Sequence, residues 1–143
     1  MSKGSDELAK KVLDGGVLIA LAVDDPSARK LKEEILREET LAFCSELAVV
    51  EMEYVLCRRL GWSVAEEKRR YLLQSKVMNV IETGTLMSEA AKLKCERALS
   101  LPDCFTLALA KIFDCKAFFV KREEEMEKEI KRRSFDVEIE FLI

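Results

Sequence analysis

Four acidic residues stand out from the hydrophobic segments around them: Asp14, Glu51, Asp103 and Glu123. Three of the four lie at predicted strand ends or on inward helix faces. Carboxylates that converge in a cleft repel one another and raise one another's pKa, and a divalent cation relieves that repulsion. Oxygen ligands without histidine or paired thiolates suit Mg²⁺ or Mn²⁺. Such a metal favours phosphoryl substrates, because it aligns a water, lowers the pKa of that water and neutralises phosphate charge.

Asp14 and Glu51 each also have a purely structural alternative. Asp14 follows an apolar strand and would cap the next helix, although the two glycines after it also let a ligand approach closely. Glu51 falls in an apolar stripe of the expected helix 46–60, where a carboxylate needs a cation or hydrogen bonds, and Arg58 two turns later would be its ion-pair partner. That stripe consists of Leu47, Val50, Tyr54 and Val55.

Asp103 and Glu123 open predicted helices, where acids are common for structural reasons. Asp103 completes a capping box with Ser100, at the start of a helix that is apolar nearly all round. Glu123 begins an acidic run after the strand 116–120, and such a run is normally the solvated start of a helix with favourable dipole placement. The sequence leaves both the structural and the functional role of each acid open.

The composition excludes some classes of chemistry. The 143 residues contain no histidine and five cysteines, none of them in CxxC spacing, which excludes Ser-His and Cys-His nucleophiles and histidine zinc sites. Acids must therefore carry any hydrolytic chemistry. A net charge of −3 leaves room only for local basic patches, since proteins that bind nucleic acid by bulk charge are usually basic.

Length and hydropathy indicate a single domain at residues 11–143 after a flexible N-terminal tail at 1–10. No apolar run approaches the roughly 20 residues of a membrane helix, and the first residues lack the apolar segment of a signal peptide. We therefore expect a cytoplasmic protein without a membrane partner. One glutamine, one asparagine and 36% charged residues are typical of a thermophilic, for example archaeal, source.

Short strands alternate with helices along the chain, a pattern that favours a parallel sheet with helices on both faces. We expect strands at 11–14, 41–44, 77–81, 116–120 and 135–143, and helices at 15–23, 26–38, 46–60, 64–75, 86–99, 101–113 and 122–133. In such a sheet, ligands bind beyond the carboxyl ends of the strands, which is where Asp14 would lie.

Three segments in order resemble motifs of the PIN-domain ribonucleases, which include the toxins of VapBC-type toxin–antitoxin pairs. LDGGVLIALA resembles the family's first strand, which ends in an acid followed by a small residue pair and an apolar helix. SELAVVEMEYVLCRRLGW resembles the serine, apolar turn and acid of the second motif. LPDCFTLALAKIFDCKAFFV resembles the third, an acid that opens an alanine-rich apolar helix. The resemblance covers about residues 11–133.

The resemblance implies an α/β fold, a three-layer sandwich with a central parallel sheet of about four or five short strands flanked by helices on both faces. It implies metal-dependent endonucleolytic cleavage of RNA, with Asp14, Glu51 and Asp103 holding Mg²⁺ or Mn²⁺ and one of them helping to deprotonate the attacking water. Glu123 would be the fourth acid of the site. The resemblance also implies a toxin with an antitoxin of VapB type and a homodimer, without a nucleotide cofactor.

Two departures from the family pattern affect the site. Gly15 and Gly16 stand where the family usually has serine or threonine after the first acid. Lys121, Arg122 and Glu123 replace the family's Thr-x-Asp, so that Glu123 would be a longer substitute and Lys121 would hold a phosphate by its charge. These changes keep a second hypothesis open, a PIN-like module that binds RNA or protein without cutting it.

Basic residues offer contacts for RNA, and we expect them at Arg58, Lys121 and Arg122. Phosphate contacts of this kind would position the strand without reading its sequence. A small phosphatase is a third hypothesis. It is disfavoured because Asp14-Gly15-Gly16 lacks the second acid of the DxD motif that such enzymes usually carry after the first strand.

Overall fold

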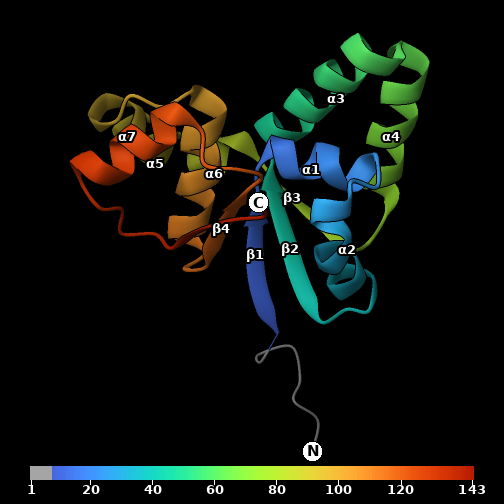
Figure 1. Cartoon of the computed structure of the whole chain (residues 1–143), viewed down its shortest axis with the longest axis horizontal. Coiled ribbons are helices and arrows are strands. Elements are labelled where there is room, and N and C mark those ends of the chain that lie inside the picture. The colour runs from blue at the N-terminus through green and yellow to red at the C-terminus, as the bar shows by residue number, and fades with distance from the viewer. Residues whose placement is uncertain (1–7) are drawn as a thin grey trace, which may run out of the picture.

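The structure, a computed structural model, describes residues 8–143. Its centre is a five-stranded sheet in which all neighbouring strands are parallel and the order is β3-β2-β1-β4-β5 (Figure 1). The strands are β1 Ala9–Leu13, β2 Thr40–Ser45, β3 Met78–Ile81, β4 Lys116–Phe119 and β5 Ile139–Phe141. The expected parallel sheet is therefore confirmed.

Helices cover both faces of this sheet and complete the three expected layers (Figure 1). The first four helices pack on one face and the last three on the other. They are α1 Gly15–Ala22, α2 Arg29–Leu36, α3 Glu46–Leu60, α4 Trp62–Gln74, α5 Thr83–Glu96, α6 Leu101–Ile112 and α7 Glu124–Arg132, with a 3₁₀ turn, η2, at Pro26–Ala28. Across residues 8–143, none of the helices is long and apolar enough to cross a membrane.

The central strands are apolar on both faces because helices cover both faces. Leu13 of β1 packs in the core with α1, α2 and α3, whereas its neighbour Val12 points to the opposite face and packs with α6. Every residue of α6 from Cys104 to Ala110 is buried. The nearly uniform hydrophobicity of this helix therefore reflects its central position, as the sequence predicted.

The strand order places a topological switch point between β1 and β4. The chain moves from β1 outward to β2 and β3, and then returns across the sheet to β4 and β5. Asp14 follows β1 directly, and its backbone N–H donates a hydrogen bond to the carbonyl oxygen of Phe118 in β4 at 3.0 Å. Open α/β sheets bind their ligands in the crevice at such a point, so the fold directs attention to Asp14.

Two expected element boundaries differ from the structure. Ala9 and Lys10, expected in the flexible tail, are the first residues of β1 because they pair with the start of β2. The expected tail at residues 1–7 lies outside the described residues. Helix α5 starts earlier than expected, at Thr83, whose backbone N–H donates to the carboxylate of Glu46 at 2.8 Å.

The last strand is shorter than the sequence predicted. Alternating apolar and acidic residues over 135–143 predicted a strand throughout, but pairing with β4 begins only at Ile139, opposite Ala117. Phe135 and Val137 pack instead against the core that contains α5 and α6. The hydrophobicity of these two residues therefore reflects core packing and not strand pairing.

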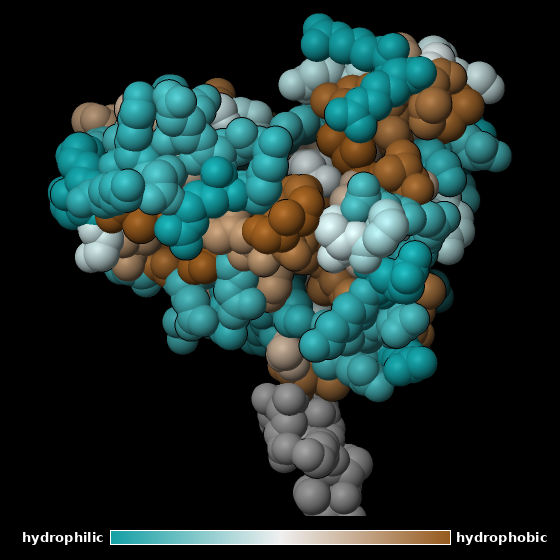
Figure 2. Space-filling view, viewed as in Figure 1, coloured by the Kyte–Doolittle hydropathy of each residue, from teal (hydrophilic) through white to brown (hydrophobic). Residues whose placement is uncertain are grey.

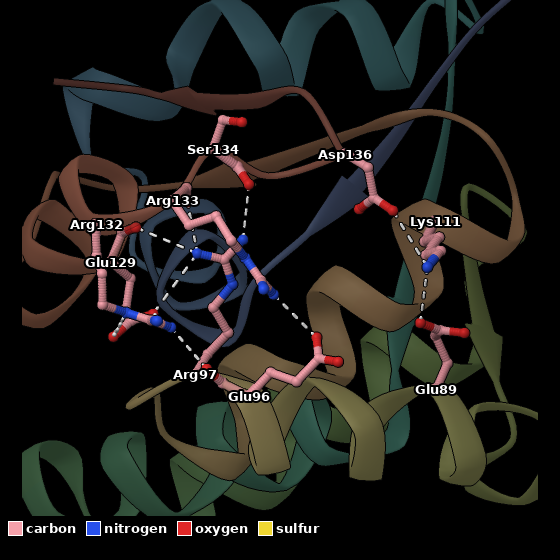
Figure 3. Close-up of polar contacts among 9 residues, drawn as sticks. All are labelled: Glu89, Glu96, Arg97, Lys111, Glu129, Arg132, Arg133, Ser134 and Asp136. Atoms are coloured by element: carbon pink, nitrogen blue, oxygen red, sulfur yellow. Dashed lines mark hydrogen bonds and ion pairs between the residues drawn. The ribbon is translucent and has the colours of Figure 1, made fainter.

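A buried arginine at the end of α5 holds the C-terminal part of the chain (Figure 3). Arg97 donates hydrogen bonds to the carbonyl oxygens of Glu129, Arg133 and Ser134 at 3.2, 2.6 and 2.8 Å. Its guanidinium lies 3.6 Å from the Glu129 carboxylate and 3.8 Å from the centroid of the Phe135 ring. Arg97 is 6% exposed and Glu129 5% exposed. This contact set fixes α7, whose first turn follows Glu123.

Replacing Arg97 by alanine should lower the free energy of unfolding by about 3 kcal/mol, because three carbonyl oxygens lose their donor and the buried Glu129 carboxylate keeps only Arg132 as a partner. Urea denaturation followed by circular dichroism measures the loss. Arg70→Ala is the matched control, since Arg70 forms an exposed ion pair with Glu66 and should cost less than about 1 kcal/mol. Equal losses in the two variants would contradict the assigned role of Arg97.

Candidate active site

Asp14 lies between β1 and α1 and is only 8% exposed. One carboxylate oxygen, Oδ2, accepts a hydrogen bond from the backbone N–H of Gly16 at 3.2 Å and so caps α1. The other, Oδ1, accepts a hydrogen bond from the Thr106 hydroxyl of α6 at 3.4 Å. The structural alternative for Asp14 is therefore correct, yet capping uses only one of the two oxygens.

Helix α3 presents a different face to the core from the one the sequence predicted. Val50 and Tyr54 of the expected stripe are 61% and 46% exposed, so this part of the prediction is wrong. The buried residues of α3 are Ala48, Val49, Met52 and Leu56. The helix packs against α1, and Glu51 is half-buried.

Glu51 lies against the first residue of α1. A Cβ atom placed on Gly15 would lie 2.3 Å from Glu51 Oε1, so the carboxylate occupies the space that a side chain would fill. Oε1 is buried, and the described residues offer it no hydrogen-bond partner. Arg58, its expected partner, lies over the Tyr54 ring at 5.0 Å, and no ion pair joins Arg58 to Glu51 within residues 8–143. The ion-pair alternative for Glu51 is therefore wrong.

Asp103 is half-buried in the first turn of α6. Ser100 Oγ accepts a hydrogen bond from the backbone N–H of Asp103 at 3.3 Å, which confirms the predicted helix start. Burial raises the pKa of Asp103 to about 6, and the charge of Asp14 adds to that rise, with smaller additions from Glu125 and Glu123. The Asp103 carboxylate therefore feels the charge of other acids as well as standing at the start of a helix.

The three acids are coupled by their charges. Burial, followed by the charge of Glu51, raises the pKa of Asp14 to about 6, although hydrogen bonds from Gly16, Gly15 and Thr106 oppose the rise. Burial and the charge of Asp103 raise the pKa of Glu51. Each acid of the trio thus makes another harder to ionise.

The donor atoms of Asp14, Glu51 and Asp103 suit a divalent cation, but the three carboxylates stand too far apart to ligate one ion together. All donors are carboxylates, and one of them ends in a buried oxygen without a partner among the described residues. Within residues 8–143, no three acidic or cysteine side chains stand close enough to ligate one ion. Binding of one cation by Asp14, Glu51 and Asp103 would therefore require their side chains to move together.

The fourth candidate acid, Glu123, has only a small electrostatic effect on the trio. Glu123 is the exposed cap residue of α7 and forms no capping hydrogen bond. Its charge raises the pKa of Asp103 less than the charge of Glu125 does.

Glu125, in the first turn of α7, was not singled out in the sequence because it is one member of an acidic run. Thr106 could have been found, since it stands one turn after Asp103 in an otherwise apolar helix.

The three basic candidates do not share one environment. Arg122 pairs with Glu127 at 3.1 Å and lies over the Phe141 ring at 5.0 Å, so the contacts hold its guanidinium at the molecular surface. Arg58 stacks on Tyr54. Lys121 is exposed, two residues after the end of β4. No ion pair in the described part of the chain joins any of them to the candidate acids.

A cavity of about 390 Å³ lies away from the acids, between α1, α2 and α4. Its walls are mostly apolar and include Leu21, Met52 and Leu72, with exposed Leu36 and Tyr71 at its rim. Figure 2 shows hydrophobic side chains at the surface beside α1 and α4. None of the four candidate acids lines this cavity, so it is a feature separate from the acidic site.

The metal-free Asp14→Asn variant should be more stable than the unchanged protein at pH 7.5 by up to about 3 kcal/mol, because the Asp14 pKa rises from 3.8 to about 6 on folding. Below pH 3.8 the carboxyl is protonated in both states, so the gain should vanish there. It should grow as the pH rises to about 6 and then stay constant.

Urea denaturation across this pH range, with a chelator present, measures the gain. Asp114→Asn is the matched control, because Asp114 is exposed and its positive φ of 52° suits asparagine. A gain for Asp14→Asn that is the same at acidic and neutral pH would show that ionisation of Asp14 does not oppose folding.

Comparisons with known proteins now add to this geometry. The sequence matches the family model described as PIN domain over residues 11–129. A search of curated proteins gave no match. Among solved structures, VapC20 of Mycobacterium tuberculosis, described as a sarcin-ricin loop cleaving toxin, shares 18% identity at a TM-score of 0.64. The alignment covers 79% of this chain and 91% of that one.

Two further solved structures have the same fold. VapBC2 from Rickettsia felis, bound to a promoter DNA fragment, shares 12% identity at a TM-score of 0.67, over 92% of this chain and 98% of that chain. A toxin-antitoxin complex from Klebsiella pneumoniae shares 15% identity at a TM-score of 0.65, over 93% and 98% of the two chains. Because the family model spans most of the chain, the motif resemblance is confirmed and this chain belongs to the PIN domain family.

Proposed function

We propose that this chain is a metal-dependent endoribonuclease whose active site is formed by Asp14, Glu51 and Asp103. The observation that carries the proposal is the place of the carboxylates: Asp14 follows β1 at the switch point of the sheet, and the Glu51 carboxylate, whose buried Oε1 has no partner among the described residues, packs on the next residue, Gly15. The charges of Asp14, Glu51 and Asp103 also raise one another's pKa. Parallel α/β sheets bind their ligands at this place. Membership of the PIN domain family supports nuclease chemistry for the same residues.

Mg²⁺ or Mn²⁺ suits the residues that are present. The donors are all carboxylates, and Glu51 Oε1 has no hydrogen bond to give up within the described residues. When bound, the cation supplies positive charge that activates a water and stabilises the charge that develops on a phosphodiester. The two glycines after Asp14 carry no side chains that would crowd this region.

The acids have separable tasks. Asp14, Glu51 and Asp103 would hold the cation, and one of them would accept a proton from the attacking water. The pKa of Asp14 and of Asp103 is about 6, so at lower pH protons compete with the cation for these carboxylates. The rate of RNA cleavage should therefore fall below about pH 6. Glu123, together with Glu125, would add negative charge from the start of α7.

Exposed cations on the neighbouring elements would hold the RNA backbone. Lys121 and Arg122 follow β4, the strand beside β1, after one intervening residue. Arg58 lies two turns beyond Glu51 on α3. These side chains would contact phosphates and so position a strand without reading its sequence.

Purified protein should cleave single-stranded RNA in the presence of Mn²⁺ and not in the presence of a chelator. Asp14→Asn and Asp103→Asn should each lower the cleavage rate at least about 100-fold, because each removes a charged cation ligand. Gel analysis of an end-labelled RNA measures the rate and the internal cut positions. A chromogenic phosphate monoester should not be hydrolysed.

Asp114→Asn and Glu33→Gln are matched controls that remove an exposed carboxylate elsewhere, and both should cleave RNA like the unchanged protein. Undiminished activity in both Asp14→Asn and Asp103→Asn would overturn the proposed site.

A module that binds RNA or protein without cutting it is the second candidate function. Two observations favour it: no three acidic side chains stand within ligating distance among the described residues, and the residues after Asp14 carry no hydroxyl. Tight RNA binding by the unchanged protein without any Mn²⁺-dependent cleavage would decide for this candidate. Cleavage that depends on Asp14 and Asp103 would decide against it.

We further propose that the chain is the toxin of a toxin–antitoxin pair, acting in the cytoplasm as a homodimer and neutralised by a VapB-type antitoxin. The Klebsiella complex and VapBC2, which share its fold, support this assignment. The apolar cavity between α1, α2 and α4 offers a protein partner a place for hydrophobic side chains.

We therefore expect a short reading frame beside this gene, whose protein should co-purify with the chain and suppress its RNA cleavage. Leu36→Asp or Tyr71→Asp should weaken that association at least about tenfold, because each places a charge at the apolar rim of the cavity. Met87→Asp is the matched control, an exposed apolar residue of α5 on the other side of the sheet. Equal weakening of the association by all three variants would contradict the proposal that the partner binds at this cavity.

A further inference from the structure

Position 15 requires a glycine because a side chain there would collide with Glu51, and not because of its backbone conformation. It is the first residue of α1 and its φ lies outside the left-handed region, so any amino acid could adopt its backbone angles. Alanine would be the better helix former at this position. An added Cβ, however, would lie 2.3 Å from Oε1, 2.8 Å from Cδ and 3.0 Å from Cβ of Glu51.

This contact restricts the whole Glu51 side chain. Oε1 is the end of a flexible chain and could swing away, but Glu51 Cβ is fixed by α3 and also lies within 3.0 Å of the added atom. A side chain at position 15 would therefore displace the Glu51 carboxylate from the first turn of α1. That displacement would move it from the region that it shares with Asp14 and Asp103.

Thr106 of α6 orients the carboxylate of Asp14. It is completely buried in α6, and its hydroxyl donates to Asp14 Oδ1 at 3.4 Å. Every residue from Cys104 to Ala110 is buried, and Thr106 brings the only hydroxyl into this stretch. A valine of the same shape would fill the space equally well, so packing alone does not account for the threonine.

We propose that Gly15 and Thr106 are positioning residues that hold the carboxylates of Glu51 and Asp14 for a divalent cation. The inference rests on the proposed function. Gly15 leaves the space that the Glu51 carboxylate occupies, and Thr106 directs one oxygen of Asp14 while the cap of α1 directs the other. Groups that orient metal ligands in this way set the affinity of a site without touching the ion.

Mn²⁺ binding, measured from the electron paramagnetic resonance signal of the free ion, tests the proposal without any substrate. Gly15→Ala should weaken binding about 10- to 100-fold, the usual effect of losing a group that orients a ligand. Thr106→Val should weaken it about three- to tenfold, as expected for one hydrogen bond, and Thr106→Ser should restore most of the loss.

Two matched controls separate positioning from packing. Thr40→Val changes another buried threonine, at the amino end of β2 and away from the acids, and should bind Mn²⁺ like the unchanged protein. Gly84→Ala adds a methyl group where no atom lies within 4 Å and should also leave binding unchanged. Equal losses in the controls and in the test variants would overturn the proposal.

A double variant guards against misfolding of Gly15→Ala. In a Glu51→Ala background the two nearest atoms, Oε1 and Cδ, are gone and only the 3.0 Å contact with Cβ remains, so Gly15→Ala should lower the melting temperature less than it does beside Glu51. The same loss of melting temperature with and without Glu51 would overturn the assigned role of Gly15.

The outcomes distinguish this inference from the proposed function. If Asp14→Asn abolishes Mn²⁺ binding while Gly15→Ala and Thr106→Val bind within twofold of the unchanged protein, the positioning role fails and the metal site stands. If the unchanged protein binds no Mn²⁺, the metal site fails and the positioning role falls with it.

Discussion

The interaction on which the candidate site depends is the repulsion between the poorly solvated carboxylates of Asp14, Glu51 and Asp103. A parallel sheet brings the carboxyl ends of its strands to one edge, and the helices that follow those strands begin there. Asp14 follows β1, Glu51 lies early in the helix after β2, and Asp103 opens the central helix α6. Helix α6 leads into the start of β4, so its first turn, with Asp103, lies toward the same edge of the sheet, and burial raises the pKa of each of the three acids.

The helix starts offset part of this cost. Asp14 caps α1, Glu51 packs on the first residue of the same helix, and Asp103 stands in the first turn of α6. Unpaired backbone N–H groups at a helix start carry partial positive charge, which stabilises nearby carboxylates. The surrounding fold supplies the rest: separate hydrophobic cores hold α1 and α3 on one face and α6 on the other, so repulsion does not push the acids apart.

Local patterns predicted the order of the elements, since strands covered on both faces and a helix buried all round leave clear hydrophobic runs. Asp14 and Asp103 followed from those runs. The inward face of α3 did not, because Val50 and Tyr54 are as apolar as the residues that pack, and only the position of α1 decides which side is buried. The Arg97 contacts and the late start of strand pairing, at Ile139, depend on residues far apart in sequence, which no local pattern contains.

The capping and catalytic explanations of an acid are not exclusive here, which is why the sequence alone left them balanced. A helix start offers a carboxylate hydrogen bonds for one oxygen and, at the edge of a parallel sheet, leaves the other oxygen toward the ligand crevice. In Asp14, one oxygen accepts from the Gly16 N–H that it caps, and the other accepts from the Thr106 hydroxyl of α6. Glu51 has neither a cap to complete nor an ion-pair partner within the described residues, so structure alone gives no reason for its buried oxygen. Among the candidate acids it is therefore the strongest indication that the fold keeps a place for a cation.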